Sequence, residues 1–361
     1  MPVEDLARSP RIAVAMSGGV DSSVAAAILA AEGADVIGLS MQLYDQRSGE
    51  QTFGSCCTLD DLHDARRVAS ALGFPHYILN LEKQFTETVV RNFVSEYVAG
   101  RTPIPCTHCN SDLKFQTLLE RAQAFGAECV ATGHYAQIDR TDDGTFQLRR
   151  SADPEKDQSY FLFGLTQAQL ARTRFPLGRL RKRDVRDMAR QLGLRVADKP
   201  DSQEICFVPS GDHAAFVARQ APSAVSPGDI RDEAGTLLGR HEGVHHFTVG
   251  QRKGLRLSSS APLYVLRIDA ADALVTVGPR AALDQTTLRA SRVNWVAGEA
   301  PTTARISAQI RHRHAARAGR LTITGTSSVQ FEFDEPQPAI SPGQAVVFYA
   351  EDLVLGGGWI D

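Results

Sequence analysis

The residues best suited to chemistry form a turn of small side chains, Ser17-Gly-Gly-Val-Asp-Ser-Ser23. An apolar run precedes it and an alanine-rich run follows, so we expect it to join a buried strand to a helix N-terminus. Two glycines let the backbone approach a ligand, and the free N–H groups of a helix start favour an anion. The turn is therefore typical of a phosphate site, although its spacing fits neither G-x-x-x-x-G-K-S/T nor G-x-G-x-x-G. A helix merely capped by Asp21 and Ser22 is the alternative.

Thiols are the second candidate for chemistry. Cys106-x-x-Cys109 follows two prolines and stands where we expect a helix to begin, which would lower a thiol pKa and favour thiolate. Cys206 lies far downstream in Asp201-Ser-Gln-Glu-Ile-Cys-Phe. A single C-x-x-C is also compatible with zinc or redox chemistry, but a structural zinc site lacks its second cysteine pair here, and His108 and His134 are weaker substitutes.

Alternating strands and helices must position these groups. Such alternation predicts a parallel sheet with right-handed crossovers, with a nucleotide bound at the carboxyl ends of the strands. The predicted strands are 11–16, 35–41, 76–81 and 129–132, and the predicted helices are 22–32, 59–72, 85–99, 111–125 and 182–192. Residues 137–150 alternate around Asp142-Asp-Gly and predict a hairpin.

A change of pattern near residue 220 marks a boundary. Pro222, Pro227 and Gly228 are followed by short alternating runs with frequent glycine and proline, which favour β structure. With 361 residues the chain exceeds one usual core. We therefore predict three domains: an α/β parallel-sheet domain over 1–219, a small, mostly-β domain over 220–283, and a β-barrel domain over 284–361.

Composition indicates an ordinary globular protein, 43% hydrophobic and 22% charged. The sequence has no run of 18 apolar residues, and the charged N-terminus does not resemble a signal peptide, so we expect a cytoplasmic protein without a membrane span. The six cysteines should then be thiols, ligands or catalytic groups and not structural bridges. Cys129 is most simply a core residue, and Cys56 and Cys57 have no evident role.

Basic residues are segregated along the chain despite a net charge of −3. Ten Lys or Arg lie between positions 172 and 199, and eight Arg between 280 and 320, whereas 321–361 contains none. This segregation favours basic surfaces that bind a polyanion. A solvated helix face is the alternative for the first cluster.

The Ser17–Ser23 turn resembles the PP-loop of ATP pyrophosphatases, and further motifs in the same order resemble the bacterial tRNA-specific 2-thiouridylase family along nearly the whole chain. These motifs cover 100–115, 131–135, 156–162, 201–207, 250–255 and 342–349. The resemblance implies conversion of the wobble uridine of tRNAs for Lys, Glu and Gln to 2-thiouridine, with ATP cleaved to AMP and pyrophosphate. It also implies Mg²⁺ as cofactor and a sulfur-donor partner, either a cysteine desulfurase or a sulfur relay protein.

The resemblance also implies roles for single residues. Cys109 would be the nucleophile and Cys206 the persulfide carrier. ATP would be held by Ala15, Met16, Ser17, Gly18, Gly19, Val20, Asp21, Ser22, Met41 and Gly133. The tRNA would be contacted by Ile104, Pro105, Cys106, His134, Lys156, Asp157, Gln158, Arg311, His312 and Gln344.

Cys106 departs from the family pattern, which more commonly has an Asp there. Cys106, Cys109 and Cys206 together resemble the cysteine set that holds a 4Fe–4S cluster in related tRNA thiolases. The persulfide route is favoured over this cluster route, and a harmless Asp-to-Cys exchange is a third possibility. Two other classes of function share parts of the pattern: a PP-loop ligase that forms amides or guanidines, and a non-catalytic, nucleotide-dependent RNA-binding protein.

Overall fold

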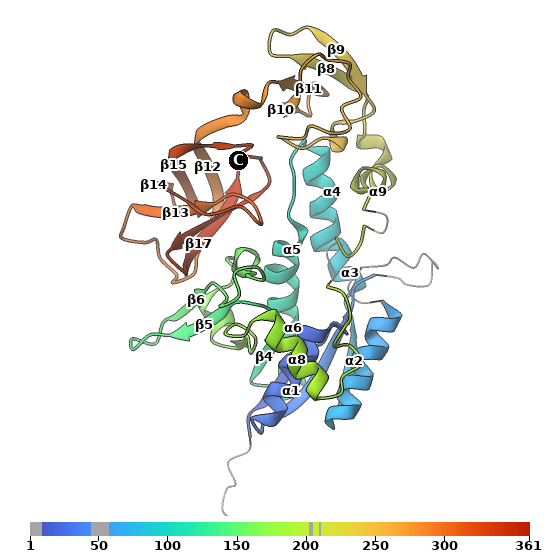
Figure 1. Ribbon diagram of the computed structural model, residues 1–361, viewed down its shortest axis with the longest axis vertical. Helices are drawn as coiled ribbons and strands as arrows, with labels where there is room; N and C mark the ends of the chain where they lie inside the picture. The colour runs from blue at the N-terminus through green and yellow to red at the C-terminus, as the bar shows by residue number, and fades with distance from the viewer. Residues whose placement is uncertain (1–8, 45–57, 202–204, 209–210) are drawn as a thin grey trace, which may run out of the picture. The chain divides into compact units, whose positions relative to one another are not determined.

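The computed structural model describes residues 9–44, 58–201, 205–208 and 211–361 (Figure 1). Cys56 and Cys57 lie outside these ranges. The chain forms two compact units: residues 1–88 with 108–209, and residues 89–107 with 210–361. Among the described residues, no helix is both long and apolar enough to cross a membrane.

A five-stranded parallel sheet is the centre of the first unit. Its strand order is β3-β2-β1-β4-β7, and every neighbouring pair is parallel. The strands are β1 (Arg11–Ala15), β2 (Asp35–Gln42), β3 (His76–Asn80), β4 (Cys129–Thr132) and β7 (Thr173–Arg174). The order reverses between β1 and β4, which is where open α/β sheets bind ligands.

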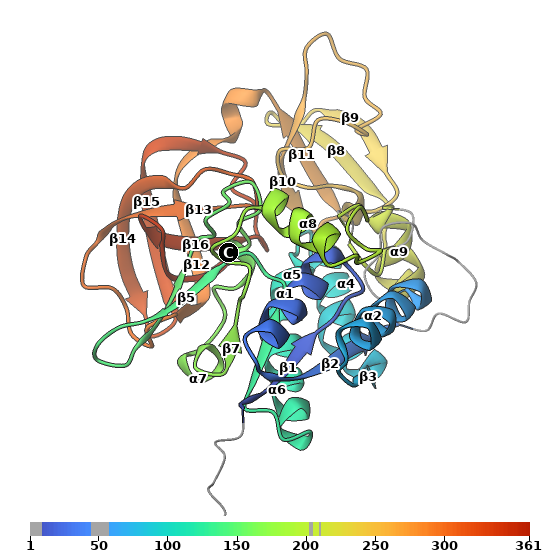
Figure 2. The same cartoon turned by 60° about the horizontal axis from the view of Figure 1, so that its bottom comes forward.

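Helices cover both faces of this sheet (Figure 2). Ile12 and Val14 pack toward α1 (Val20–Ala31), α2 (Leu59–Leu72) and α8 (Lys182–Gln191). Ala13 points the other way, into a cluster with Leu118 and Leu119 of α6 (Phe115–Ala124). Successive side chains of a strand point to opposite faces, so an apolar run like 11–16 forms a strand buried on both sides.

Local signals set the ends of α2. Thr58 and Asp61 form a capping box at its start, and Gly73 ends it with φ of 81°. The prediction of a helix over 59–72 is confirmed. A hairpin of β5 (Gln137–Arg140) and β6 (Phe146–Arg149) is confirmed as well.

The helices around the C-x-x-C are less regular than predicted. The segment predicted as one helix over 85–99 consists of α3 (Glu82–Phe85), a π-helical stretch η1 (Thr86–Val90) and α4 (Arg91–Val98). The helix predicted from 111 begins earlier, as α5 (Pro105–His108) and the π-helical η2 (Cys109–Lys114) leading into α6. Cys109 is therefore beyond the first helical turn, because Pro105 already provides a helix start. Shorter elements follow: η3 (Ser159–Phe161) and α7 (Gln167–Leu170).

A small mixed sheet and its helices begin the second unit. Its strand order is β10-β11-β8-β9, with β11 and β8 parallel. Ile230, Val265 and Val275 form part of its core. Its elements are α9 (His213–Gln220), η4 (Pro222–Ala224), β8 (Gly228–Asp232), β9 (Leu237–His241), η5 (Val244–His246), β10 (Tyr264–Asp269), β11 (Leu274–Gly278) and η6 (Arg280–Leu283).

A closed barrel completes the second unit, drawn orange to red in Figure 1. Its strands follow the order β12-β15-β14-β13-β16-β17, and β12 also pairs with β17. Leu288, Phe331 and Phe348 fill its interior. The strands are β12 (Asp284–Trp295), β13 (Arg305–Gln309), β14 (Arg317–Gly325), β15 (Ser328–Pro338), β16 (Ala345–Ala350) and β17 (Leu353–Ile360). The predicted fold class, a parallel-sheet α/β domain followed by a small β domain and a β-barrel, is confirmed.

Candidate nucleotide site and thiol segments

The turn after β1 has the geometry of an anion site. Gly18 adopts φ of +73°, and Gly19 is the N-cap of α1 without any side-chain capping bond. The hydroxyls of Ser22 and Ser23 donate to the Gly19 carbonyl at 3.3 and 2.8 Å, and the Ser17 N–H donates to Ser22 Oγ. The serines thus shape the turn. Because no side chain caps the helix, Asp21 and Ser22 are not mere caps, and the first-turn N–H groups fit a phosphate.

Glycine is required at two places where other elements meet this turn. A Cβ on Gly18 would lie 2.1 Å from the carbonyl oxygen of Asp61 in α2. A Cβ on Gly133, just after β4, would lie 2.7 Å from the backbone of both Asp21 and Ser22. The end of β4 therefore touches the turn directly, as expected at the point where the strand order reverses.

An ion-pair network surrounds Asp21. Lys182 Nζ lies 2.8 and 2.7 Å from the two carboxylate oxygens of Asp21 and 2.8 Å from Asp201 Oδ1. The Tyr135 hydroxyl donates to Asp21 Oδ1 at 2.8 Å, and the Lys182 ammonium lies 5.8 Å from the Tyr135 ring centroid. Burial, together with the Asp21 charge and hydrogen bond, raises the pKa of Tyr135, so its hydroxyl stays protonated.

Asp201 connects this network to the segment that carries Cys206. Besides Lys182, it binds Lys156 Nζ at 2.7 Å and Arg186 Nη2 at 3.1 Å. Burial alone would raise the pKa of Asp201, but hydrogen bonds from Lys156 and Lys182 lower it to about 2. The carboxylate is therefore ionised and holds three cations.

The segment 156–158, predicted to contact tRNA, forms many bonds inside its own unit. Asp157 accepts hydrogen bonds from the Ser151 and Ser159 N–H groups and from Arg150. Gln158 Oε1 accepts the Tyr135 N–H at 2.9 Å. The structure thus gives these two side chains a local supporting role beside the turn.

Lys199 braces the turn from the other side. Its ammonium donates to the Gly18 carbonyl at 3.1 Å, to Asp61 at 2.6 Å and to Asp64 at 2.8 Å. Sequence reasoning assigned no role to Lys182, Lys199 or Asp201. The available signal was that Asp201 begins the motif that contains Cys206 and that Lys199 lies two residues before it.

His134, at the end of β4, is held as a neutral imidazole. Its Nδ1 lies 2.7 Å from Thr132 Oγ1, and its ring contacts those of Phe115 and Phe175. Burial, and to a lesser extent the charge of Lys114, lower the pKa of His134 to about 3. A neutral side chain is available here at physiological pH for hydrogen bonding beside the predicted adenosine site.

This lowered pKa predicts how pH affects stability. The unfolded chain protonates His134 near its ordinary pKa of 6.5, whereas the folded chain does so only near 3, so acid favours unfolding between these values. We expect wild type to lose about 1 kcal/mol per pH unit relative to His134→Gln as pH falls from about 6.5 to 5. Urea unfolding at several pH values measures this. Parallel pH profiles of the two proteins would contradict the lowered pKa of His134.

Both segments that carry the predicted reactive thiols pack on α3. Cys109 is buried at the start of η2, which contacts α3, and Cys206 is partly exposed. Phe207, the neighbour of Cys206, packs edge-on against Phe85 of α3 with ring centroids 5.4 Å apart. The fold thereby draws together two segments that the sequence separates widely. Within the described ranges, no group of three or more His, Cys, Asp or Glu could hold a metal ion.

Cys129 is a core residue, as predicted. It is buried in β4, and burial raises its thiol pKa. Cys129 forms no disulfide in the structure.

The remaining predicted tRNA contacts belong to the second unit. Ile104 and Pro105 are buried, whereas Cys106 is exposed. Two bonds hold the segment just before them: the Thr102 N–H donates to the Pro342 carbonyl at 2.9 Å, and Gln344 Nε2 donates to the Thr102 carbonyl at 3.0 Å. Gln344 thus anchors the chain that leads to the thiols.

Two more predicted contacts lie after β13. Arg311 Nη1 donates to the Pro338 carbonyl at 3.0 Å, and His312 is exposed. The basic residues around α8 divide in two: Lys182 and Arg186 face the network, whereas Arg183 and Arg190 are exposed and pair with nearby acids. The solvated-face interpretation therefore holds for only part of this cluster.

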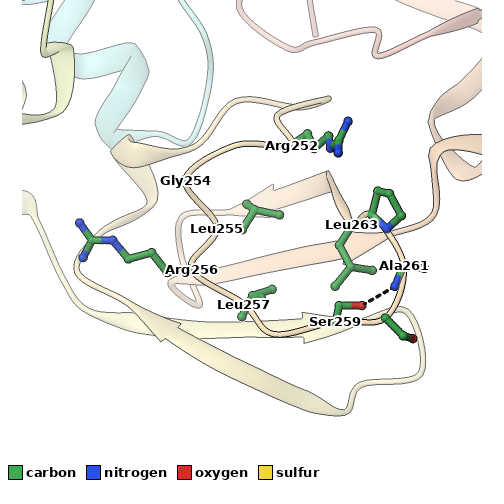
Figure 3. A pocket seen from close by; sticks show the side chains of 10 residues that line it. Arg252, Gly254, Leu255, Arg256, Leu257, Ser259, Ala261 and Leu263 are labelled. Atoms are coloured by element: carbon green, nitrogen blue, oxygen red, sulfur yellow. Dashed lines mark hydrogen bonds between the residues drawn. The ribbon is translucent and has the colours of Figure 1, made fainter.

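A pocket lies in the second unit under the loop that follows Gly250 (Figure 3). Figure 3 shows Arg252 and Arg256 on different sides of it, with Leu255 and Leu263 facing its interior. No residue predicted for catalysis or for nucleotide binding lines this pocket.

Three family models match the chain in order. A model described as tRNA methyl transferase HUP domain matches residues 10–210, which is more than half of the chain. A tRNA methyl transferase PRC-barrel domain matches residues 214–279, and an aminomethyltransferase beta-barrel domain matches residues 285–360.

Relatives match over nearly the full length. The chain is 55% identical to the tRNA-specific 2-thiouridylase MnmA of Solibacter usitatus, over 97% of this chain and 99% of the relative. The chain belongs to the tRNA-specific 2-thiouridylase family. It is also 51% identical to the family member of Geobacter metallireducens, over 97% of this chain and 96% of that protein. The resemblance inferred from the motifs is confirmed, and the chain is an enzyme of this sulfurtransferase family.

Proposed function

We propose that this enzyme is an ATP-dependent tRNA 2-thiouridylase. It replaces O2 of the wobble uridine of tRNAs for Lys, Glu and Gln by sulfur and releases AMP and pyrophosphate. The observation that carries the proposal is the match to relatives of that name along 97% of the chain. The turn at Gly18 and the two thiol segments on α3 support it, since the reaction needs both.

The nucleotide is assigned to the turn between β1 and α1. Residues 15–22 hold the phosphates of ATP, and Met41 and Gly133 flank the adenosine. The left-handed Gly18 and the uncapped start of α1 fit a polyphosphate. Mg²⁺ would neutralise phosphate charge, and Asp21 is the carboxylate within the turn that suits it.

Uridine O2 is a poor leaving group, so it is first made a better one. O2 attacks the α-phosphorus of ATP, which expels pyrophosphate and leaves AMP bonded to O2. The terminal sulfur of a Cys206 persulfide then attacks C2 and displaces AMP. The Cys109 thiolate attacks Cys206 Sγ, which breaks the S–S bond, leaves sulfur on C2 and forms a Cys109–Cys206 disulfide. A dithiol reductant restores both thiols.

The three predicted domains have different roles in the proposed reaction. Residues 1–219 form the catalytic domain, 220–283 a small central domain and 284–361 a tRNA-contacting barrel. A wobble base in a single-stranded loop can be splayed out of its stack for recognition. Residues 104–106, His134, Lys156 and Gln344 are the proposed substrate contacts. Arg311 and His312 would contact the tRNA. A cysteine desulfurase or a sulfur relay protein supplies the persulfide, and the reaction takes place in the cytoplasm.

An iron–sulfur route would use Cys106, Cys109 and Cys206 as ligands and leave one iron open for sulfide. Anaerobic purification followed by iron and acid-labile sulfide assays separates the two routes. The persulfide route requires an active, colourless and iron-free enzyme. Activity that depends on stoichiometric iron would replace it by the cluster route.

The function is tested by mass spectrometry of tRNA from cells that lack this protein. We expect 2-thiouridine to disappear from the three tRNAs and to return when the gene is restored. Unchanged 2-thiouridine in a strain without a second copy would refute the assignment. Loss of a methylated nucleoside instead would favour the methyltransferase description of the family models.

A further inference from the structure

The phosphate turn itself contains no basic side chain between Ser17 and Ser23. Loops that bind the β- and γ-phosphates of a nucleotide usually include a lysine that neutralises their charge. In this fold two lysines from distant parts of the chain reach the turn. They are Lys182, the first residue of α8, and Lys199.

Lys199 is occupied by structural bonds. An ammonium group has three hydrogens, and Lys199 has three acceptors: the carbonyl of Gly18 and the carboxylates of Asp61 and Asp64. To reach a ligand it would have to break a bond that braces the turn. Lys199 therefore supports the site from behind.

Lys182 is placed differently. Only 12% of its side chain is exposed, and its ammonium bridges Asp21, inside the turn, to Asp201, outside it. Asp21 lies in the first turn of α1, beside the N–H groups that fit a phosphate. A small movement of this ammonium would bring it to an anion bound at the helix start.

The rest of the network can tolerate that movement. Lys156 and Arg186 remain on Asp201 when Lys182 leaves, so this carboxylate keeps two cations. Asp21 keeps the hydroxyl of Tyr135 as a donor. Both carboxylates therefore keep at least one donor when the ammonium of Lys182 moves to an anion.

We propose that Lys182 is the lysine that contacts the polyphosphate of the nucleotide, supplied by α8 because the turn lacks one of its own. Asp21 and Asp201 hold its ammonium in place when no nucleotide is bound. Asp201 leads into the segment with Cys206. Transfer of Lys182 to the phosphates therefore also breaks one ion pair that holds that segment, the pair between Lys182 and Asp201. The inference rests on the proposed use of ATP.

Calorimetric titration of the full chain with ATP and with AMP, each with Mg²⁺, tests the role of Lys182. Lys182→Met removes the charge and keeps the apolar stem. We expect its affinity for ATP to fall about 10- to 100-fold, the effect of one charged hydrogen bond, and its affinity for AMP to stay within about twofold. Equal losses for both ligands, or no loss for ATP, would overturn the proposal.

Matched variants control for charge and folding. Arg183→Met removes the same charge one residue along α8, where the side chain is 75% exposed, and should leave both affinities unchanged. Lys182→Arg should keep most of the ATP affinity. If Lys182→Met fails to fold because it leaves Asp21 without a cation, Lys182→Gln removes the charge and keeps a hydrogen-bond donor for Asp21. It should fold and bind ATP as weakly as predicted.

The two proposals fail separately. Nucleotide titration needs neither tRNA nor a sulfur donor. If Lys182→Met binds ATP normally and the wild-type enzyme thiolates tRNA, the proposed role of Lys182 is refuted and the proposed function stands. If Lys182→Met loses affinity for ATP selectively but the wild-type protein never thiolates tRNA, the proposed function is refuted and the role of Lys182 stands. A wild-type chain that binds no ATP removes both.

Discussion

Replacing either Cys109 or Cys206 by Ser will abolish tRNA thiolation, with a rate at least about a thousandfold lower, because a hydroxyl can neither carry a persulfide nor resolve one. The two variants should differ in what they accumulate. After incubation with sulfur donor, Cys109→Ser should retain an extra sulfur atom on Cys206, whereas Cys206→Ser should retain none. Intact-protein mass spectrometry before and after reduction reads out this difference.

Cys129→Ala is the matched control for that experiment. Its thiol lies in the core of the sheet domain and its pKa is raised by burial, so it should take no part in sulfur transfer. Binding of tRNA and ATP should survive in all three variants. Thiolation that persists in both Cys109→Ser and Cys206→Ser would exclude the persulfide mechanism.

Gly18→Ala should be the most damaging single change outside the thiols. Its Cβ would lie 2.1 Å from the Asp61 carbonyl oxygen, and its φ of +73° strains any L side chain. Backbone strain costs about 1 kcal/mol and the forced separation of α2 from the turn about 1 to 3 kcal/mol more. We expect lower stability in urea and a loss of ATP binding, since the turn itself must move.

Gly33→Ala separates the two causes. Gly33 also has a left-handed backbone, with φ of +83°, but a Cβ added there would meet no atom within 4 Å. Gly33→Ala should therefore lose only the stability that backbone strain costs, and it should keep its affinity for ATP. Similar losses in Gly18→Ala and Gly33→Ala would mean that α2 yields readily and that close packing on the turn is unimportant.

Local patterns predicted those parts of the fold that local forces determine. The strand before Ser17, the helix over 59–72 with its Gly73 terminus, and the hairpin over 137–150 all depend on periodicity, capping or turn residues close in sequence. The glycine-rich turn was recognisable for the same reason.

The ion pairs and hydrogen bonds that support the site could not be predicted from local patterns. Lys182 and Asp21 are 161 positions apart, and which lysine of a basic run turns inward depends on how α8 packs on α1. Asp157 and Gln158 similarly form bonds to backbone groups that only the folded chain brings near. Ion pairs and side-chain hydrogen bonds between residues far apart in sequence leave no periodic pattern. Counting charges therefore identifies the basic cluster over 172–199 but does not separate its buried members from its solvated ones.

The π-helical stretch η2 has a consequence for insertions and deletions. A π turn accommodates one more residue than an α turn, and η2 begins at Cys109 and leads into the regular helix α6. Deleting one residue between 110 and 114 would let a regular α-helix form in its place. Cys109 would then rotate by about 100° around the helix axis relative to α6. The π-helical stretch thus sets the direction in which Cys109 points. An insertion or deletion here would misplace its thiol without unfolding the helix.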